Sequence, residues 1–147
     1  MKSIFDPFEN QALIARISKL QPSNKAAWGK MNATQMCQHT NAAILVAFGE
    51  KEVKVNFIIR LLGRMMKNKV FNSEFKKNSP TAKEFIFVDQ YDFETARNEL
   101  IKNFSRFAEG QSSITISNHP FWGELSHEDW NKLMWNHIDH HLRQFNI

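Results

Sequence analysis

Cysteine, glycine and proline are scarce in this sequence of 147 residues, which holds one Cys, five Gly and four Pro. The single cysteine, Cys37, has no partner for a disulfide within the chain. Few glycines and prolines leave room for long helices, because both residue types interrupt them. The composition, with 42% hydrophobic residues, is that of a globular protein and excludes a disordered or fibrous chain.

Long hydrophobic runs are also lacking. The longest one, residues 42–48, is too short to cross a bilayer. Asp6 and Glu9 interrupt any apolar start of a signal peptide. We therefore predict a cytoplasmic protein with no membrane partner. The length suits one domain that spans residues 1–147.

Positive charge is concentrated in the middle of the chain, which has a net charge of +4. Residues 51–83 contain nine basic residues against Glu52 and Glu74. Such a segment can attract an anionic small molecule, a nucleic acid or a membrane surface, although we favour a solvated helix face. No known nucleic-acid-binding pattern accompanies it, so we expect no nucleic-acid partner. The nine residues are Lys51, Lys54, Arg60, Arg64, Lys67, Lys69, Lys76, Lys77 and Lys83.

Apolar residues at helical spacing predict an all-α fold, a four-helix bundle with an inserted amphipathic helix and a long loop. The main helices are expected at residues 6–20, 32–48, 92–109 and 126–145. In the first of these we expect Phe8, Leu13, Ile14 and Ile17 to point inward.

The insertion follows the second main helix. Residues 53–69 form an amphipathic helix with a basic face, which we expect to cover one side of the bundle. Residues 70–89 are the least regular part of the sequence, and a loop of this length is often a lid or a binding element.

Three histidines lie on helix faces that should point inward. In the last helix, His137 and His141 are four residues apart and share a narrow stripe with Trp130, Leu133 and Gln144. In the second helix, His39 lies on the same side as small residues such as Ala42. Neutral imidazole is a common ligand for zinc, and three protein ligands leave a fourth position open for water or substrate. The sequence therefore predicts a divalent-metal site made of His39, His137 and His141, with zinc as the default and nickel, iron or manganese as alternatives.

Other polar residues near these positions have open roles. His140 lies at the edge of the stripe, either as a boundary residue or as a support or proton shuttle for the site. Gln35 and Gln144 share the faces of His39 and His141 and are candidates to hydrogen-bond a ligand ring or a substrate. His119 and His127 are expected not to be ligands. Ile138 follows His137, so the His-Glu-x-x-His peptidase pattern is absent.

The motifs in this order resemble the DinB-like, or YfiT-like, superfamily of metalloenzymes, in a branch catalogued as a domain of unknown function. The resemblance rests on segments spread over most of the chain. These are Trp28-Gly29-x-Met31, Gln35-Met36-x-x-His39, His119-Pro120-Phe121-Trp122-Gly123-x-Leu125 with Trp130, and His137-x-x-His140-His141-x-x-Gln144-Phe145. It implies a four-helix bundle, often a homodimer, that holds a divalent metal through His39, His137 and His141.

The resemblance also implies an activity. Better-understood members are thiol-dependent S-transferases, in which the metal holds a low-molecular-weight thiol as a thiolate that attacks a small-molecule electrophile. Many relatives carry Arg-Gly-Gln directly after the last ligand, where this chain has Leu142-Arg143-Gln144. Two other functions stay open: a metal-dependent hydrolase that uses a bound water, and a non-catalytic, stress-related binding module.

Overall fold

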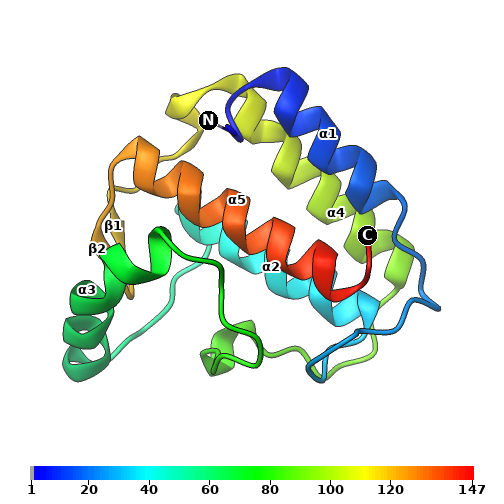
Figure 1. Ribbon diagram of the computed structural model, residues 1–147, viewed down its shortest axis with the longest axis horizontal. Helices are drawn as coiled ribbons and strands as arrows, with labels where there is room; N and C mark the ends of the chain where they lie inside the picture. Colours follow the sequence, from blue (N-terminus) through cyan, green and yellow to red (C-terminus); the bar gives the residue numbers. More distant parts are fainter. Residues whose placement is uncertain (1) are drawn as a thin grey trace.

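The computed structural model describes residues 2–147, and nearly all of its regular structure is helical (Figure 1). The all-α prediction is therefore confirmed. The five α-helices are α1 (Pro7–Ser18), α2 (Ala33–Ala47), α3 (Phe57–Phe71), α4 (Phe93–Ser105) and α5 (His127–Gln144). Three short 3₁₀ helices are η1 (Lys83–Phe85), η2 (Arg106–Glu109) and η3 (Gln111–Ser113). A two-stranded antiparallel hairpin joins β1 (Asn118–His119) to β2 (Gly123–Glu124).

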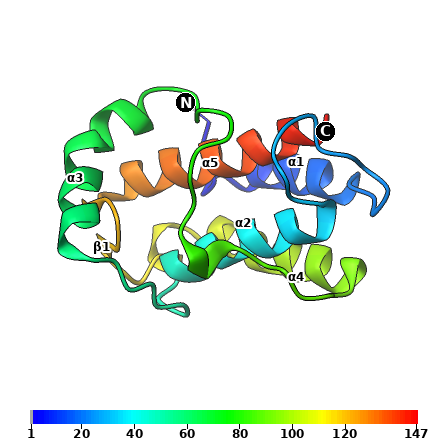
Figure 2. The same ribbon diagram turned by 90° about the horizontal axis from the view of Figure 1, so that it is seen from below.

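Four of these helices enclose the hydrophobic core. α2 packs against α4 and α5, and α1 packs against the same two helices (Figures 1 and 2). The largest side chains in this core are fully buried, so α2 and α5 are held in a fixed relation by packing. They include Trp130, Phe104, Phe107, Phe145, Leu13, Met36 and Leu142.

Local sequence signals set where the helices begin. The backbone N–H of Glu9 donates to the Asp6 side chain at the start of α1, where Pro7 occupies the first turn. α2 and α5 each begin with a complete capping box, in which the side chain of the cap and the residue three positions on bond each other's backbone N–H. These caps set where the two helices that carry the histidines begin.

Phe8 is an error of the sequence prediction. Its side chain is 83% exposed, whereas Leu13, Ile14 and Ile17 are buried as expected. At about 100° per residue, Phe8 falls almost opposite the centre of that buried stripe. The inward position is taken instead by Asn10, whose amide donates to the carbonyls of Ile4 and Phe104.

α3 lies at one end of the molecule, beside the β1–β2 hairpin and one end of α5 (Figures 1 and 2). Its inner side carries Gly63, Lys67 and, at the end of the helix, the buried Phe71. Gly63 sits so close to the hairpin turn that a Cβ there would come within 2.1 Å of the Phe121 carbonyl oxygen. Lys67 donates to the Glu124 carbonyl and the Asp129 carboxylate. The apolar side of α3 therefore faces outward.

Within residues 2–147, no helix has both the length and the apolar character needed to cross a membrane.

Candidate metal centre

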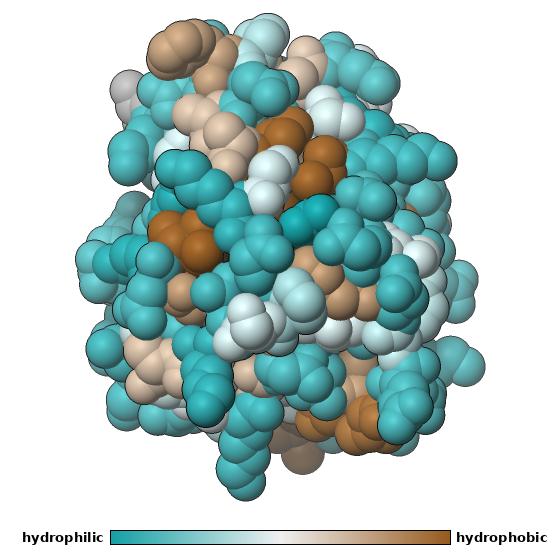
Figure 3. Space-filling view, turned by 90° about the vertical axis from the view of Figure 1, so that its right-hand side faces the viewer, coloured by the Kyte–Doolittle hydropathy of each residue, from teal (hydrophilic) through white to brown (hydrophobic). Residues whose placement is uncertain are grey.

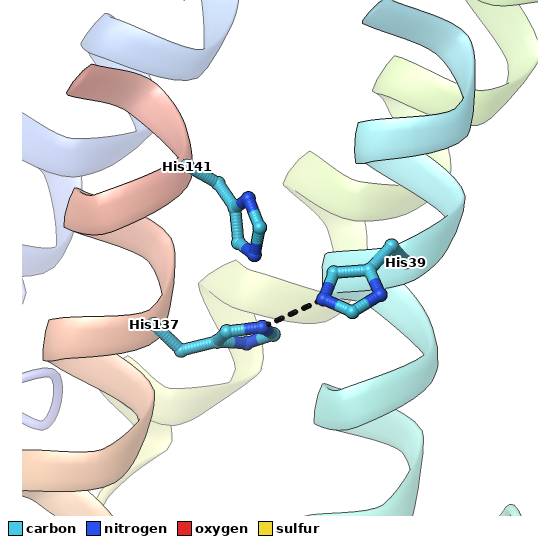
Figure 4. A group of neighbouring side chains, drawn as sticks. All are labelled: His39, His137 and His141. Atoms are coloured by element: carbon cyan, nitrogen blue, oxygen red, sulfur yellow. Dashed lines mark hydrogen bonds between the residues drawn. The ribbon is translucent and has the colours of Figure 1, made fainter. Parts of the chain in front are cut away.

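The three predicted histidines come together between α2 and α5 (Figure 4). His39 lies near the middle of α2, and His137 and His141 lie one turn apart on the facing side of α5. The ring centroids are 5.0 Å apart for His39 and His137, 4.7 Å for His39 and His141, and 4.8 Å for His137 and His141. One ring nitrogen from each residue lies within 4.8 Å of the others, so the three side chains could hold one metal ion.

Two of the rings are oriented by acceptors on their outer nitrogens. His39 Nδ1 lies 3.1 Å from the Phe85 carbonyl oxygen, and His141 Nδ1 lies 2.8 Å from Gln144 Oε1. Because both partners can only accept, each Nδ1 carries the proton and donates. In the neutral ring the lone pair is then on Nε2, which is the atom that faces the cluster. This is the arrangement that a metal-binding imidazole requires.

Gln144 connects the cluster to the segment that precedes α2. Its Nε2 donates to the Trp28 carbonyl oxygen at 2.7 Å, while its Oε1 accepts from His141. These two bonds fix which end of the amide faces the ring. Gly29 makes room for it, since a Cβ at this position would come within 2.7 Å of Gln144 Nε2. Of the two roles considered for Gln144, the structure shows the hydrogen bond to a histidine ring.

The irregular segment after α3 closes the other side of the cluster. Gln35 Nε2 donates to the Phe87 carbonyl at 2.9 Å, and His39 bonds the Phe85 carbonyl, so α2 holds this segment through two side chains. Gln35 therefore supports the segment that orients His39 and makes no bond to a ring. The ring of Phe75 lies 6.1 Å from that of His137, so an aromatic side chain from the predicted loop also borders the cluster.

Removal from water keeps the cluster uncharged. Burial lowers the pKa of His39 below its usual value and that of His141 to about 3. The pKa of His137 is lowered well below its usual value, first by loss of hydration and then by the neighbouring imidazoles. Because the three imidazoles are neutral, they can bind a cation without a net release of protons.

The donor set fits a divalent metal ion. Two imidazole nitrogens bound to one tetrahedral zinc at about 2.0–2.1 Å lie about 3.3 Å apart. The Nε2 atoms of His39 and His137 are hydrogen-bonded at 3.0 Å, and the ring nitrogens of the three histidines lie within 4.8 Å of one another, so the group brackets that separation. Among the residues that the structure describes, the group consists of these three histidines, with no carboxylate or thiolate. Such a set leaves a coordination position open.

Of the remaining histidines, none belongs to the group. His119 Nδ1 accepts from the backbone N–H groups of Phe121 and Trp122, at 3.0 and 3.3 Å, and so shapes the hairpin turn. His127 is exposed in the first turn of α5. His140 is buried, with its ring 5.6 Å from that of Trp28 and 5.1 Å from that of His141. His140 thus lies beside His141, and its role as a support or proton shuttle stays a prediction.

A pocket of about 290 Å³ lies beside His140 and Phe75, and none of the three cluster histidines lines it. His140 and Phe75 form the wall nearest the three histidines, because Phe75 also contacts His137. Lys77 lies with its ammonium 4.2 Å from the centre of the Trp28 ring. The pocket is lined by Trp28, Glu74, Phe75, Lys77, His140 and Arg143.

A family model of proteins of unknown function, DUF1569, matches residues 7–147. The chain belongs to the DUF1569 family. This agrees with the branch of unknown function that the motifs predicted, while the wider DinB-like relationship stays a prediction. No curated protein and no solved structure matches this DUF1569 member.

Proposed function

We propose that this DUF1569 protein is a divalent-metal-dependent enzyme that acts on a small molecule, with His39, His137 and His141 as the ligands. The observation that carries the proposal is the paired orientation of His39 and His141. Each donates its outer N–H to a fixed acceptor and turns its other nitrogen toward the same point. Zinc and nickel are the preferred ions, because both accept imidazole.

A metal held by His39, His137 and His141 would act as a Lewis acid and would lower the pKa of a bound thiol or water. By analogy with the superfamily that the motifs resemble, we propose thiol S-transfer as the reaction, with a low-molecular-weight thiol as co-substrate. The chain supplies the surroundings. Phe75 and Phe85 border the cluster with apolar surface, and the adjoining pocket offers room for a small molecule.

His140 is the titratable residue of this pocket that lies closest to the cluster. Its pKa is lowered by burial and by the positive charge of Arg143, so it is neutral near pH 7. A neutral imidazole in this place is able to accept the proton that a bound thiol or water releases.

Cobalt-loaded protein tests the reaction class. A thiol that enters the open position changes the visible absorption of the ion, so we expect a spectral change on addition of a low-molecular-weight thiol. The matched sample is the His137→Ala variant, which we expect to keep its helical circular dichroism and to lose cobalt. If the cobalt absorption instead changes with pH near neutrality and does not respond to the thiol, hydrolysis by a bound water would be favoured. Loss of helical structure in the metal-free parent would favour a structural metal.

A further inference from the structure

The apolar face of α3, which we define as Phe57, Ile58, Leu61, Leu62 and Met65, is exposed to an unusual degree. Phe57 is 77% exposed, Met65 75% and Ile58 68%. At about 100° per residue these five positions occupy one continuous arc, centred on Met65. The side of the molecule turned away from α3 looks different, because it is mostly hydrophilic with small separate apolar spots (Figure 3). Contiguous apolar surface of this kind marks an interaction site.

The outward orientation is fixed by contacts on the opposite side of the helix. Gly63 lies against the backbone of Phe121, and Lys67 bonds both the Glu124 carbonyl and Asp129. Rotation of α3 to bury its apolar face would break these bonds and bring a bulky side chain where only glycine fits. The surface is therefore a stable feature of the fold.

Basic residues accompany the apolar face. Between Val53 and Ser73 there is no Asp or Glu, and the nearest acidic residue before this stretch is Glu52. Lys67 is neutralised by its ion pair with Asp129. The side chains of Lys54, Arg64 and Lys69 are exposed. A second copy of the chain docked on this face would bring the same positive charges together, whereas an anionic surface would complement them.

We propose that the apolar face of α3 docks on an anionic lipid surface, with the helix lying in the plane of the interface. A helix in this position inserts its apolar side at the boundary of the acyl chains, while its Lys and Arg side chains reach the phosphate groups. The expectation of no membrane partner rested on the lack of a long hydrophobic run, and residues 53–69 were expected to cover one side of the bundle. The structure leaves the apolar side uncovered.

The expected effects follow from burial and charge. Each Lys or Arg near an anionic surface strengthens binding about fivefold. Each buried Ile, Leu or Met side chain contributes a factor on the order of ten or more. Replacement of two central apolar residues should therefore abolish binding, and reversal of one flanking charge should weaken it on the order of tenfold or more.

The test is flotation of the full chain with vesicles of phosphatidylcholine alone or mixed with phosphatidylserine. The apolar variant is Ile58→Glu with Met65→Glu, and the charge variant is Lys69→Glu. Phe8→Glu is the matched control, because Phe8 is 83% exposed on α1 and lies outside this face. All substituted side chains are exposed, and circular dichroism checks that the helices persist.

A second measurement reports on the helix itself. Met65→Cys can be labelled with an environment-sensitive dye at one position, since Cys37 is buried and burial raises the pKa of its thiol to about 12. We expect the emission of the dye to shift to the blue with anionic vesicles only.

The proposal predicts that the parent and Phe8→Glu float with anionic vesicles and that salt weakens this binding. The variant with both Ile58→Glu and Met65→Glu should not float. The proposal is overturned if the parent does not float with anionic vesicles, or if it floats equally well with neutral vesicles. It is also overturned if sedimentation shows a dimer of the parent that the double variant does not form, because the face then belongs to a second copy. None of these outcomes depends on metal at the histidines.

Discussion

Replacement of Gln144 by Leu should weaken metal binding although Gln144 is not one of the proposed ligands. Gln144 Oε1 accepts from His141 Nδ1 at 2.8 Å, and its Nε2 donates to the Trp28 carbonyl at 2.7 Å. The variant frees the His141 ring to rotate or to move its proton to Nε2. Loss of such a supporting bond typically costs 10- to 100-fold in affinity, or about 1.4–2.7 kcal/mol. The His141 Nδ1–H and the Trp28 carbonyl would both lose their hydrogen-bond partner, which should destabilise the metal-free protein by about 1–3 kcal/mol for each group.

Two further variants separate ring orientation from stability. Gln144→Glu keeps an acceptor for His141 and loses the donor to Trp28, so it should retain metal affinity although it is less stable. Thr40→Val removes a buried hydroxyl that bonds the Met36 carbonyl on α2, and it should lower stability without an effect on metal. The assays are competition with a chromophoric chelator for affinity and urea unfolding of the metal-free forms. Equal affinity in the parent and Gln144→Leu would refute the argument that this amide orients His141.

Three other predictions concern the buried histidines and Gly63. The pKa values of the three cluster histidines are lowered, so protons compete only weakly with a metal ion for them. The pH at which half of the metal is released should therefore lie below the usual imidazole value of about 6.5. A midpoint above that value would contradict this. His119 has a pKa of about 3 in the folded protein because it is buried. The unfolded state therefore binds one more proton at His119 between that value and about 6.5. This residue alone should lower the free energy of unfolding by up to about 1.4 kcal/mol per pH unit in this window as the pH decreases, and the other buried histidines of the metal-free protein add to the slope that urea unfolding measures; a flat profile would count against it. Gly63→Ala should destabilise the protein by about 1–3 kcal/mol, because the new Cβ would lie 2.1 Å from the Phe121 carbonyl oxygen, whereas the exposed Asn68→Ala on the same helix should be nearly neutral; equal unfolding midpoints for the two would argue against the close packing of α3.

The three-histidine cluster was predictable because its members are side chains on regular helices. The spacing of His137 and His141 and the inward face of His39 determine their convergence once α2 and α5 pack together. Gln144 was a candidate for the same reason. The acceptor for His39 is the backbone carbonyl of Phe85, in an irregular segment. A backbone carbonyl leaves no signature in the sequence, so this half of the support could not be predicted.

The orientation of α3 shows a second limit. The amphipathic pattern of residues 53–69 identifies a helix with two different faces, and it does not say which face packs inward. Gly63 decides this, because only its missing side chain lets the helix approach the Phe121 backbone. Phe8 was misplaced for a simpler reason: it is apolar, yet its position on the helical wheel lies opposite the buried stripe of α1.

The most direct test of the metal site is the metal content of untagged protein by mass spectrometry, measured beside the His39→Ala variant. His39 is the one ligand on α2, so its loss removes one side of the site and leaves the His137–His141 pair on α5. We expect about one equivalent of a divalent ion, zinc or nickel first, in the parent and almost none in the variant. Absence of metal from both proteins, even after incubation with zinc and nickel, would contradict the proposed metal centre.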